Sequence, residues 1–513
     1  MKQQEREAKR ISRREVLQGA GATAGAAFWG NAIPTPATSF AETQQHIVAS
    51  LTATAASVAA SWAKAIHKVR YEDLSPEVIK RTKLCILDNL GVLAHTSLLK
   101  PSRLYVERPL AIGGAREATV WGFNVKLPLE TAAACNALLI HGNEIDDSDF
   151  RSNYRPSCVS LAPALTVADY CKASGRDLLL ATAIAYTVNG LLAAQLNGLQ
   201  GLGFMPSSVV GAAGAAAVYA KLKKFDTEKT EWALSLGIGA GGGLFQYYFD
   251  QTEEKKLHVA RAARSGIECA MLAAKGWEGP AHIVEGAAGM MPSYLRGTGR
   301  KVDYEKLKQA ISAFDGTLYV YPKFTSCSAS IGPFIDALAP VYRKEKIKAA
   351  EVAKFIIVNE WSPDSPFTKK ILHFEPPQTI VGAQLNMNFT VSLFLHRGSA
   401  SVYDFVEASL KDKAVLELAN RAAHETVPSG KEWAVKVEMK DGRVIHAPFR
   451  RSNGERPEPE MLERRLEKFK TLTRDRLTDT TRQRVMEMVD GLDKVTDVAA
   501  WTAAVHKLFR PSR

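Results

Sequence analysis

The sequence has few cysteines, and none of their spacings gives them a chemical role. Six cysteines are scattered over 513 residues, and no two of them form a CxxC pair. A disulfide framework or a zinc site needs cysteines at characteristic short spacings, so neither is predicted. We expect most of these cysteines to be buried apolar side chains instead.

Several functional motifs are also missing. The chain has no GxSxG, P-loop or HExxH motif, and its IGAGGG segment lies in a helical region with no preceding strand, so it predicts no dinucleotide site. After the N-terminus, no run of about 18 uninterrupted apolar residues predicts a membrane span. The formal net charge is +12, but basic clusters are not interleaved with aromatic residues. Small anions are therefore the expected ligands, and nucleic acid is not.

The N-terminus is typical of a transport signal. Arg13 and Arg14 precede a weakly hydrophobic run rich in alanine and glycine, and a small-x-small site follows at residues 39–41. We predict a twin-arginine-type signal peptide over residues 1–41 and export to the periplasm, with no membrane attachment after its removal. The alternative is a disordered basic tail on a cytoplasmic protein.

Most of the chain has the pattern of buried helices. Apolar residues recur at three- and four-residue spacing in alanine-rich segments as far as about residue 318, which predicts close helix packing. β-Branched and aromatic residues then become frequent, and EWAVKVEMKDGRVIHAPF predicts two strands around an Asp441–Gly442 turn. We predict a mainly α fold, with helical segments at 42–318 and 451–513 and a smaller α+β domain at 319–450. The charged RRLEKFKTLTRDRLT segment is predicted to be a solvated helix face.

The stretch HGNEIDDSDFRSNYRPS at residues 141–157 is the main candidate for chemistry. It holds four carboxylates, two arginines and one histidine. Its spacing is not that of a calcium loop, and a single histidine does not indicate a transition metal, so no metal is predicted. A solvated loop is the default interpretation of such a stretch. However, it follows an almost fully apolar helix end, where burial would raise the pKa of a carboxyl group.

Four basic residues interrupt apolar or small-residue segments elsewhere, namely Lys221, Lys255, His258 and Lys323. A single lysine in such a place usually extends its ammonium group to solvent at a helix end. Several of them meeting in one cleft would instead form a site for a di- or tricarboxylate. The sequence spacing does not decide between these two alternatives.

A series of segments follows in a fixed order along the chain and includes LCILDNLGVLAHTS, AAACNALLIHGNEIDDSDF, GFMPSSVVGAAGAAA and KKLHVARAARSGIECAMLAAKGW. Together these segments resemble the MmgE/PrpD family, which includes 2-methylcitrate dehydratase, cis-aconitate decarboxylase and iminodisuccinate epimerase. The resemblance extends from about residue 50 to the end. It implies one large helical domain built from both ends of the chain, an α+β lid, a homodimer, and no metal or organic cofactor.

The family pattern H-x-x-D-[FY]-D-D-T maps onto consecutive residues of the acid-rich stretch. The matching residues are His141, Glu144, Asp146, Asp147 and Ser148. Glutamate thus replaces the first aspartate and serine replaces threonine, so a carboxylate and a hydroxyl are both kept.

Three histidines of the family are replaced in this chain. The H-P-[ST] histidine is Arg155, the GFHP histidine is Met205, and the lid histidine is Ser328. A guanidinium does not exchange a proton near neutral pH, whereas an imidazole does. Two family lysines are matched to Lys221 and Lys323, so the resemblance implies that charges for binding carboxylates remain.

The resemblance implies a cofactor-independent lyase, a dehydratase or decarboxylase, that abstracts a proton next to a carboxylate of a small di- or tricarboxylate-like acid. The expected catalytic residues are Glu144 as general base, together with Ser148, Arg155, Lys221 and Lys323. The expected substrate-binding residues are Asp146, Asp147, His141, Ser328, Lys255 and His258. An epimerase or isomerase of the same substrate class and a non-catalytic binding protein are the alternatives.

Overall fold

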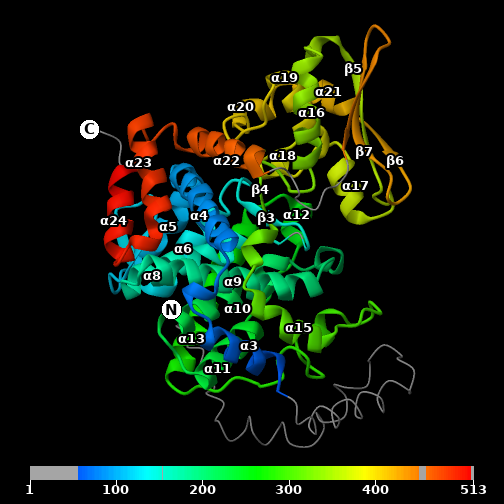
Figure 1. The fold of residues 1–513 in the computed structure, drawn as a ribbon. Helices are drawn as coiled ribbons and strands as arrows, with labels where there is room; N and C mark the ends of the chain where they lie inside the picture. The colour runs from blue at the N-terminus through cyan, green and yellow to red at the C-terminus, as the bar shows by residue number, and fades with distance from the viewer. Residues whose placement is uncertain (1–55, 153, 450–457, 510–513) are drawn as a thin grey trace, which may run out of the picture. The chain divides into compact units, whose positions relative to one another are not determined.

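The computed structural model describes residues 56–152, 154–449 and 458–509, without the side chains of residues 458–461. Residues 56–513 form one compact unit, shown in Figure 1. The predicted signal peptide at residues 1–41 lies outside the described residues. The prediction of a mainly α protein with a smaller α+β part is confirmed.

The first part of the chain is a series of helices with three short strands. The helices are α3 (Val58–Lys68), α4 (Pro76–Thr96), α5 (Lys100–Ile112), α6 (Leu129–Ile140), α7 (Pro156–Val159), α8 (Leu161–Cys171), α9 (Gly175–Gln195), α10 (Pro206–Leu222), α11 (Thr227–Gly239), α12 (Gln246–Asp250), α13 (Glu254–Ala274), α14 (Met290–Tyr294) and α15 (Tyr304–Ala310). The strands are β1 (Ala118–Val120), β2 (Val125–Leu127) and β3 (Asp147–Asp149). Small residues let these helices pack closely, because a Cβ added at Gly266 of α13 would lie 2.2 Å from the Ala212 carbonyl oxygen of α10.

The later part of the chain first adds an α+β region. It comprises β4 (Val320–Pro322), α16 (Gly332–Lys344), β5 (Val352–Asn359), α17 (Pro366–Leu372), α18 (Ile380–Gln384), α19 (Met387–Arg397), α20 (Glu407–Leu410), α21 (Lys413–Asn420), β6 (Ala423–Thr426), β7 (Trp433–Met439) and β8 (Val444–Phe449). The sheet order is β6-β5-β7-β8. The predicted hairpin is confirmed as antiparallel β7 and β8, and Gly442 in its turn has a φ of 89°.

The chain ends in α22 (Glu458–Thr473), α23 (Asp479–Asp490) and α24 (Val498–Leu508). Their apolar residues, including Phe469, Val489 and Trp501, join the same hydrophobic core as the first helices. Trp501 lies edge-on to Trp121 with ring centroids 6.3 Å apart. Residues of the α+β region form a second core around Phe334, Phe355 and Val435. Figure 1 shows the red C-terminal helices beside the blue and cyan N-terminal ones.

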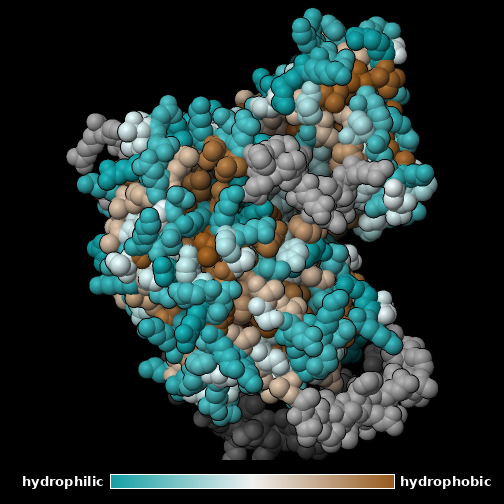
Figure 2. All heavy atoms as spheres, viewed as in Figure 1, coloured by the Kyte–Doolittle hydropathy of each residue, from teal (hydrophilic) through white to brown (hydrophobic). Residues whose placement is uncertain are grey.

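The surface is mostly hydrophilic on the face drawn in Figure 2, where apolar side chains appear as separate patches. Among the described residues, α9 alone has the length and hydropathy of a membrane-spanning helix. Within its most apolar window, 83% of the residues are buried inside the protein, which is typical of a core helix.

Candidate active site

The acid-rich stretch forms a buried loop between α6 and α7. Residues 141–149 are all buried, although three are aspartates and one is a glutamate. Glu144 has a φ of 50°, the left-handed region that non-glycine residues occupy only at a cost in backbone strain. This loop is therefore held in place from within the protein and is not a solvated turn.

Strand pairing brings a lysine to this loop from the start of the α+β region. β3 pairs antiparallel with β4, and Asp147 lies opposite Pro322. Lys323 therefore follows directly beside Asp146. Its Nζ lies 2.9 Å from Asp146 Oδ1 and 2.9 Å from Glu144 Oε2.

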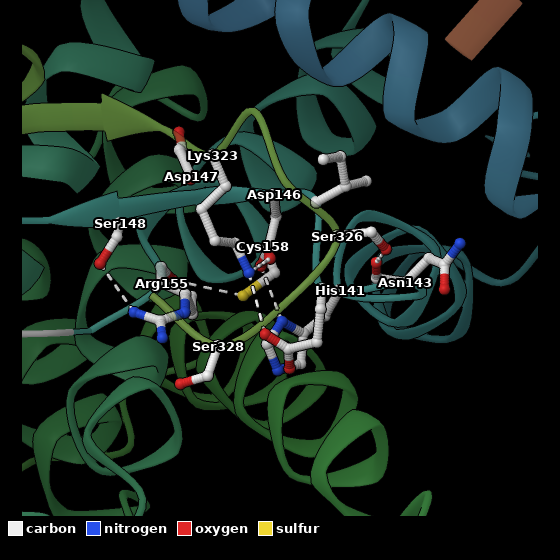
Figure 3. Close-up of polar contacts among 12 residues, drawn as sticks. His141, Asn143, Asp146, Asp147, Ser148, Arg155, Cys158, Lys323, Ser326 and Ser328 are labelled. Carbon is white, nitrogen blue, oxygen red and sulfur yellow. Dashed lines mark hydrogen bonds and ion pairs between the residues drawn. The ribbon is translucent and has the colours of Figure 1, made fainter. Parts of the chain in front are cut away.

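A second lysine reaches Glu144 from the first turn of α13. The Lys255 ammonium forms an ion pair with the other carboxylate oxygen of Glu144. On the neighbouring acid, Asp146 Oδ2 lies 2.7 Å from His141 Nδ1. Figure 3 shows Lys323, Asp146 and His141 pointing toward one another.

Burial and the neighbouring charges set the protonation of this cluster. Burial lowers the pKa of His141 to about 3, so its imidazole is neutral and Nδ1–H donates to Asp146. Burial opposes ionisation of Asp146, but Lys323 and His141 outweigh it and hold its pKa well below the usual range. Burial lowers the pKa of Lys323, and burial together with Lys323 and Lys256 lowers that of Lys255. Two lysines with lowered pKa values thus flank the Glu144 carboxylate.

Arg155 lies at the other end of the acid-rich stretch, directly before α7. Its Nη1 donates to Ser148 Oγ at 2.7 Å, and its backbone N–H donates to Ser207 Oγ at 2.8 Å. Arg155, Glu144, His141 and Ser328 line a pocket of about 470 Å³. The same pocket is also lined by apolar and aromatic side chains, among them Tyr247 and Tyr248. His258 does not line the pocket, but its ring centroid lies 5.9 Å from that of Tyr247.

Comparison with known proteins identifies the family of the chain. Residues 60–303 match the MmgE/PrpD N-terminal domain, and residues 326–494 match the MmgE/PrpD C-terminal domain. The chain belongs to the MmgE/PrpD family. It is 26% identical to the cis-aconitate decarboxylase of Homo sapiens over 474 residues, which cover 87% of this chain and 94% of that protein. It is 30% identical to the cis-aconitate decarboxylase of Mus musculus over 246 residues, 46% of this chain and 50% of that one. The prediction of an enzyme of the lyase class is confirmed.

One expected catalytic residue of this MmgE/PrpD protein lies elsewhere, and the expectation for Lys221 is corrected. Its Nζ donates to the carbonyl oxygens of Ile66 at 2.7 Å and Val69 at 2.6 Å, at the end of α3. A lysine beside the last carbonyls of a helix is favoured by the helix dipole. Lys221 lines a separate pocket of about 1720 Å³. Lys255, which the resemblance implies only as a substrate-binding residue, meets Glu144 together with Lys323.

Asp147 also departs from its expected role in substrate binding. Its carboxylate accepts from the backbone N–H of Ser157 at 3.0 Å and from the Ser157 hydroxyl at 2.5 Å. The same hydroxyl contacts Tyr186 and accepts from Asn89 at 2.8 Å. Burial raises the pKa of Asp147 to about 6. Figure 3 shows its side chain pointing away from His141 and Arg155, so it belongs to the interior and not to the pocket.

The residues on both sides of Glu144 are anchored by parts of the chain that are distant in sequence. On one side, Gln384 Nε2 donates to Asn143 Oδ1 at 2.8 Å, and Ser326 Oγ donates to the Asn143 carbonyl at 2.7 Å. On the other side, Lys468 Nζ donates to the Ile145 carbonyl at 2.7 Å. These anchors hold the left-handed backbone of Glu144 and so fix the direction of its carboxylate.

Lys468 corrects the prediction that its helix presents only a solvated charged face. Lys468 is 7% exposed and Arg465 is 2% exposed, and Lys468 pairs with buried Asp88 at 2.8 Å. Arg465, Lys468, Phe469 and Leu472 recur at helical spacing on one face of α22. That mixed spacing is the signal in the sequence, although charged residues in it favour the prediction of a solvent-facing helix.

One group near the pocket has the ligand types of a metal site. Ligand atoms of His141, Asp146 and Cys158 lie within 4.8 Å of one another, and all three residues are buried. However, Lys323 Nζ lies 2.9 Å from Asp146, and its ammonium group would repel a divalent cation. Burial also raises the pKa of Cys158 well above its usual value, which disfavours the thiolate that binds metals.

Proposed function

We propose that this protein is a lyase that removes water or carbon dioxide from a small organic acid, by moving a proton at the carbon next to a carboxylate. The observation that carries the proposal is Glu144, held between Lys255 and Lys323 at a pocket that Arg155 also lines. Both curated relatives named above are cis-aconitate decarboxylases, which supports a carboxylate substrate. We propose that the reaction uses no metal or organic cofactor.

Arg155 is the proposed anchor of the substrate. Its planar guanidinium can donate two parallel hydrogen bonds to one carboxylate. Ser148, 2.7 Å from Arg155 Nη1, orients that group. Because a guanidinium keeps its proton near neutral pH, Arg155 binds and neutralises the carboxylate but does not act as the acid or base.

Glu144 is the proposed general base. Its two ammonium partners favour the ionised carboxylate, which accepts the proton from the carbon next to the substrate carboxylate. The electrons of that C–H bond move toward the carboxylate, and Lys323 and Arg155 stabilise the enediolate charge that develops.

Lys255 is the proposed proton donor for the second half of the reaction. Its lowered pKa makes loss of its proton easier than for a lysine in water. In a dehydration, Lys255 protonates the leaving hydroxyl, which departs as water as the double bond forms. In a decarboxylation, Glu144 removes no proton first: the bond to the carboxyl carbon breaks, its electron pair stays with the neighbouring carbon as carbon dioxide leaves, and Lys255 protonates that carbon.

The proposal is tested by incubating the full-length protein in deuterated buffer with citrate, methylcitrate, aconitate, aspartate-like and aryl-substituted acids. NMR then follows each acid. Loss of water or carbon dioxide together with deuterium uptake is the expected result. Deuterium uptake without any loss of substrate would replace the lyase by an epimerase or isomerase. No change in any acid would contradict the proposed reaction and favour a binding protein.

Two further expectations stand as proposals. We propose that the protein is exported by the twin-arginine route, which cell fractionation with and without the Arg13 and Arg14 pair would test. We also propose a homodimer, as the family resemblance implies. Light scattering of the full-length protein would give about twice the 56.0 kDa chain mass if that is correct.

A further inference from the structure

The charged side chains at and next to the pocket have a net charge that about one negative charge on the ligand would balance. Arg155 and Glu144 line the pocket, and Lys255, Lys323 and Asp146 are the charged side chains paired with Glu144 or with its lysine partner. Together these five groups give 3 − 2 = +1. His141 is neutral because burial lowers its pKa to about 3. Ionised Asp147 behind the loop would only lower this sum. A buried charge needs a partner of opposite sign, so a tricarboxylate would bring two charges that this pocket does not balance.

One part of the pocket lining, the apolar wall, suits an apolar group. It is formed by Met205, Phe245, Tyr247, Tyr248, Phe367 and Leu385. Three of these rings form a continuous stack, because Phe245 lies 5.0 Å from Tyr248 at 12° and Tyr248 lies 5.1 Å from Phe367 at 22°. Burial of an apolar substituent against such rings is favourable, whereas a carboxylate there would lose its hydration.

One polar atom in this wall has no partner within the protein. Among the residues that the structure describes, the buried Tyr248 hydroxyl accepts and donates no hydrogen bond. Burial raises the pKa of Tyr248, so the hydroxyl keeps its proton and is a donor. An unpaired buried hydroxyl is costly, and a neutral oxygen on a ligand would satisfy it.

We infer that the substrate is a monocarboxylic acid with a planar apolar substituent, its carboxylate at Arg155 and its apolar body along the ring stack. The inference rests on the proposed function and names the substrate class of the same pocket. It departs from the di- or tricarboxylate that the sequence predicts and from the cis-aconitate in the relatives' names. Met205 and Ser328, which replace family histidines, remove two groups that could carry further positive charge at this pocket.

The test measures binding of four acids to the full-length protein by calorimetry at pH 7.5 and fixed ionic strength. The probes are 3-phenyllactate, with one charge and a ring; lactate, with one charge; phenylsuccinate, with two charges and a ring; and cis-aconitate, with three charges. We expect 3-phenyllactate to bind tightest, by on the order of tenfold over each of the others. Tighter binding of cis-aconitate, or no binding of 3-phenyllactate, would overturn the inference.

Two variants separate charge from shape. Glu144→Gln raises the pocket charge by one, so the preference for 3-phenyllactate over phenylsuccinate should fall by on the order of tenfold; an unchanged preference would contradict the charge argument.

Phe367→Ala tests the shape of the pocket and should weaken the binding of 3-phenyllactate but not that of lactate. Phe249→Ala is the matched control, because Phe249 packs on Tyr248 with centroids 5.8 Å apart but does not line the pocket. Thermal unfolding checks that each variant folds.

Failure of this inference can be distinguished from failure of the proposed lyase. If cis-aconitate binds tightest and loses carbon dioxide, the lyase stands and the monocarboxylate inference falls. If 3-phenyllactate binds tightest but no acid exchanges a proton, the pocket has the inferred charge and shape, and the proposed reaction falls.

Discussion

Two pockets of this protein lie beside lysines that adjoin runs of small residues, and of the two only the pocket at Glu144 has the features of an active site. The pocket at Lys221 spans about 1720 Å³ and the pocket at Glu144 spans about 470 Å³, open solvent included. Lys221 donates to backbone carbonyls. Lys255 and Lys323 instead pair with the buried carboxylate of Glu144, whose backbone is left-handed. The difference shows that the partner of a lysine indicates chemistry better than the size of a pocket does.

Exchanging either lysine for methionine should separate the two pockets most clearly. Lys255→Met removes the proposed proton donor, so kcat should fall on the order of 10²–10⁴-fold. Lys221→Met should leave kcat per folded molecule unchanged and lower the free energy of unfolding by about 1 to 3 kcal/mol, because several backbone carbonyls lose their donor. Steady-state kinetics and urea unfolding of both variants measure this. Equal loss of kcat in both would remove the distinction between the pockets.

Arg155→Lys tests the carboxylate anchor of the smaller pocket. A lysine keeps the charge but cannot donate two parallel hydrogen bonds to one carboxylate. KM should therefore rise by on the order of tenfold, with a smaller change in kcat. The Arg151→Lys variant is the control, since Arg151 pairs with Asp149 and does not line the pocket. A KM that is the same in wild type and Arg155→Lys would contradict the anchor.

Lys468→Met tests whether the anchors beside Glu144 matter for catalysis. Loss of the bond to the Ile145 carbonyl should loosen the left-handed backbone, and misplacement of a base lowers kcat by roughly tenfold or more. KM should change less, because Arg155 is untouched. Lys468→Arg, which keeps a donor, should restore part of kcat. If kcat of Lys468→Met equals that of the wild type while only its stability falls, Lys468 is structural alone.

Asp147→Asn should have the smallest effect and a defined pH dependence. The pKa of Asp147 is about 6 in the folded protein, above the ordinary value of 3.8, so its protonated form is favoured by folding. This contribution to stability is complete below about pH 4 and is lost as the pH rises through 6. Asparagine does not titrate, so the variant should gain about 1 to 3 kcal/mol relative to wild type between pH 4.5 and 7.5. Urea unfolding at these two pH values decides. A free energy of unfolding, variant minus wild type, that stays constant or falls from pH 4.5 to 7.5 contradicts the assignment.

The fold and the acid-rich loop were predictable from the sequence because both depend on local pattern. Helical periodicity predicts the mainly α fold, and alternation around Asp441 and Gly442 predicts the β7–β8 hairpin. The apolar helix before His141 already indicated that the acids of the loop are buried. These signals each lie within a few turns of the chain.

The partners within the site were not predictable, because long-range packing determines them. Lys323 reaches Asp146 through the pairing of β3 with β4, and Lys468 reaches the Ile145 carbonyl from the C-terminal helix. Lys221 and Lys255 look alike in the sequence, since each adjoins a run of small residues. Only the packing of α10 against the end of α3, and of α13 against the loop, distinguishes them.

The most direct test of the account is solvent-deuterium uptake into a substrate acid, measured by NMR for wild type, Glu144→Gln and Lys221→Met under the same conditions. Thermal unfolding of each protein first establishes that it is folded. We expect Lys221→Met to exchange the proton at the wild-type rate and Glu144→Gln to lose exchange by on the order of 10²-fold or more. Exchange at the wild-type rate in Glu144→Gln, with loss in Lys221→Met, would place the chemistry in the other pocket.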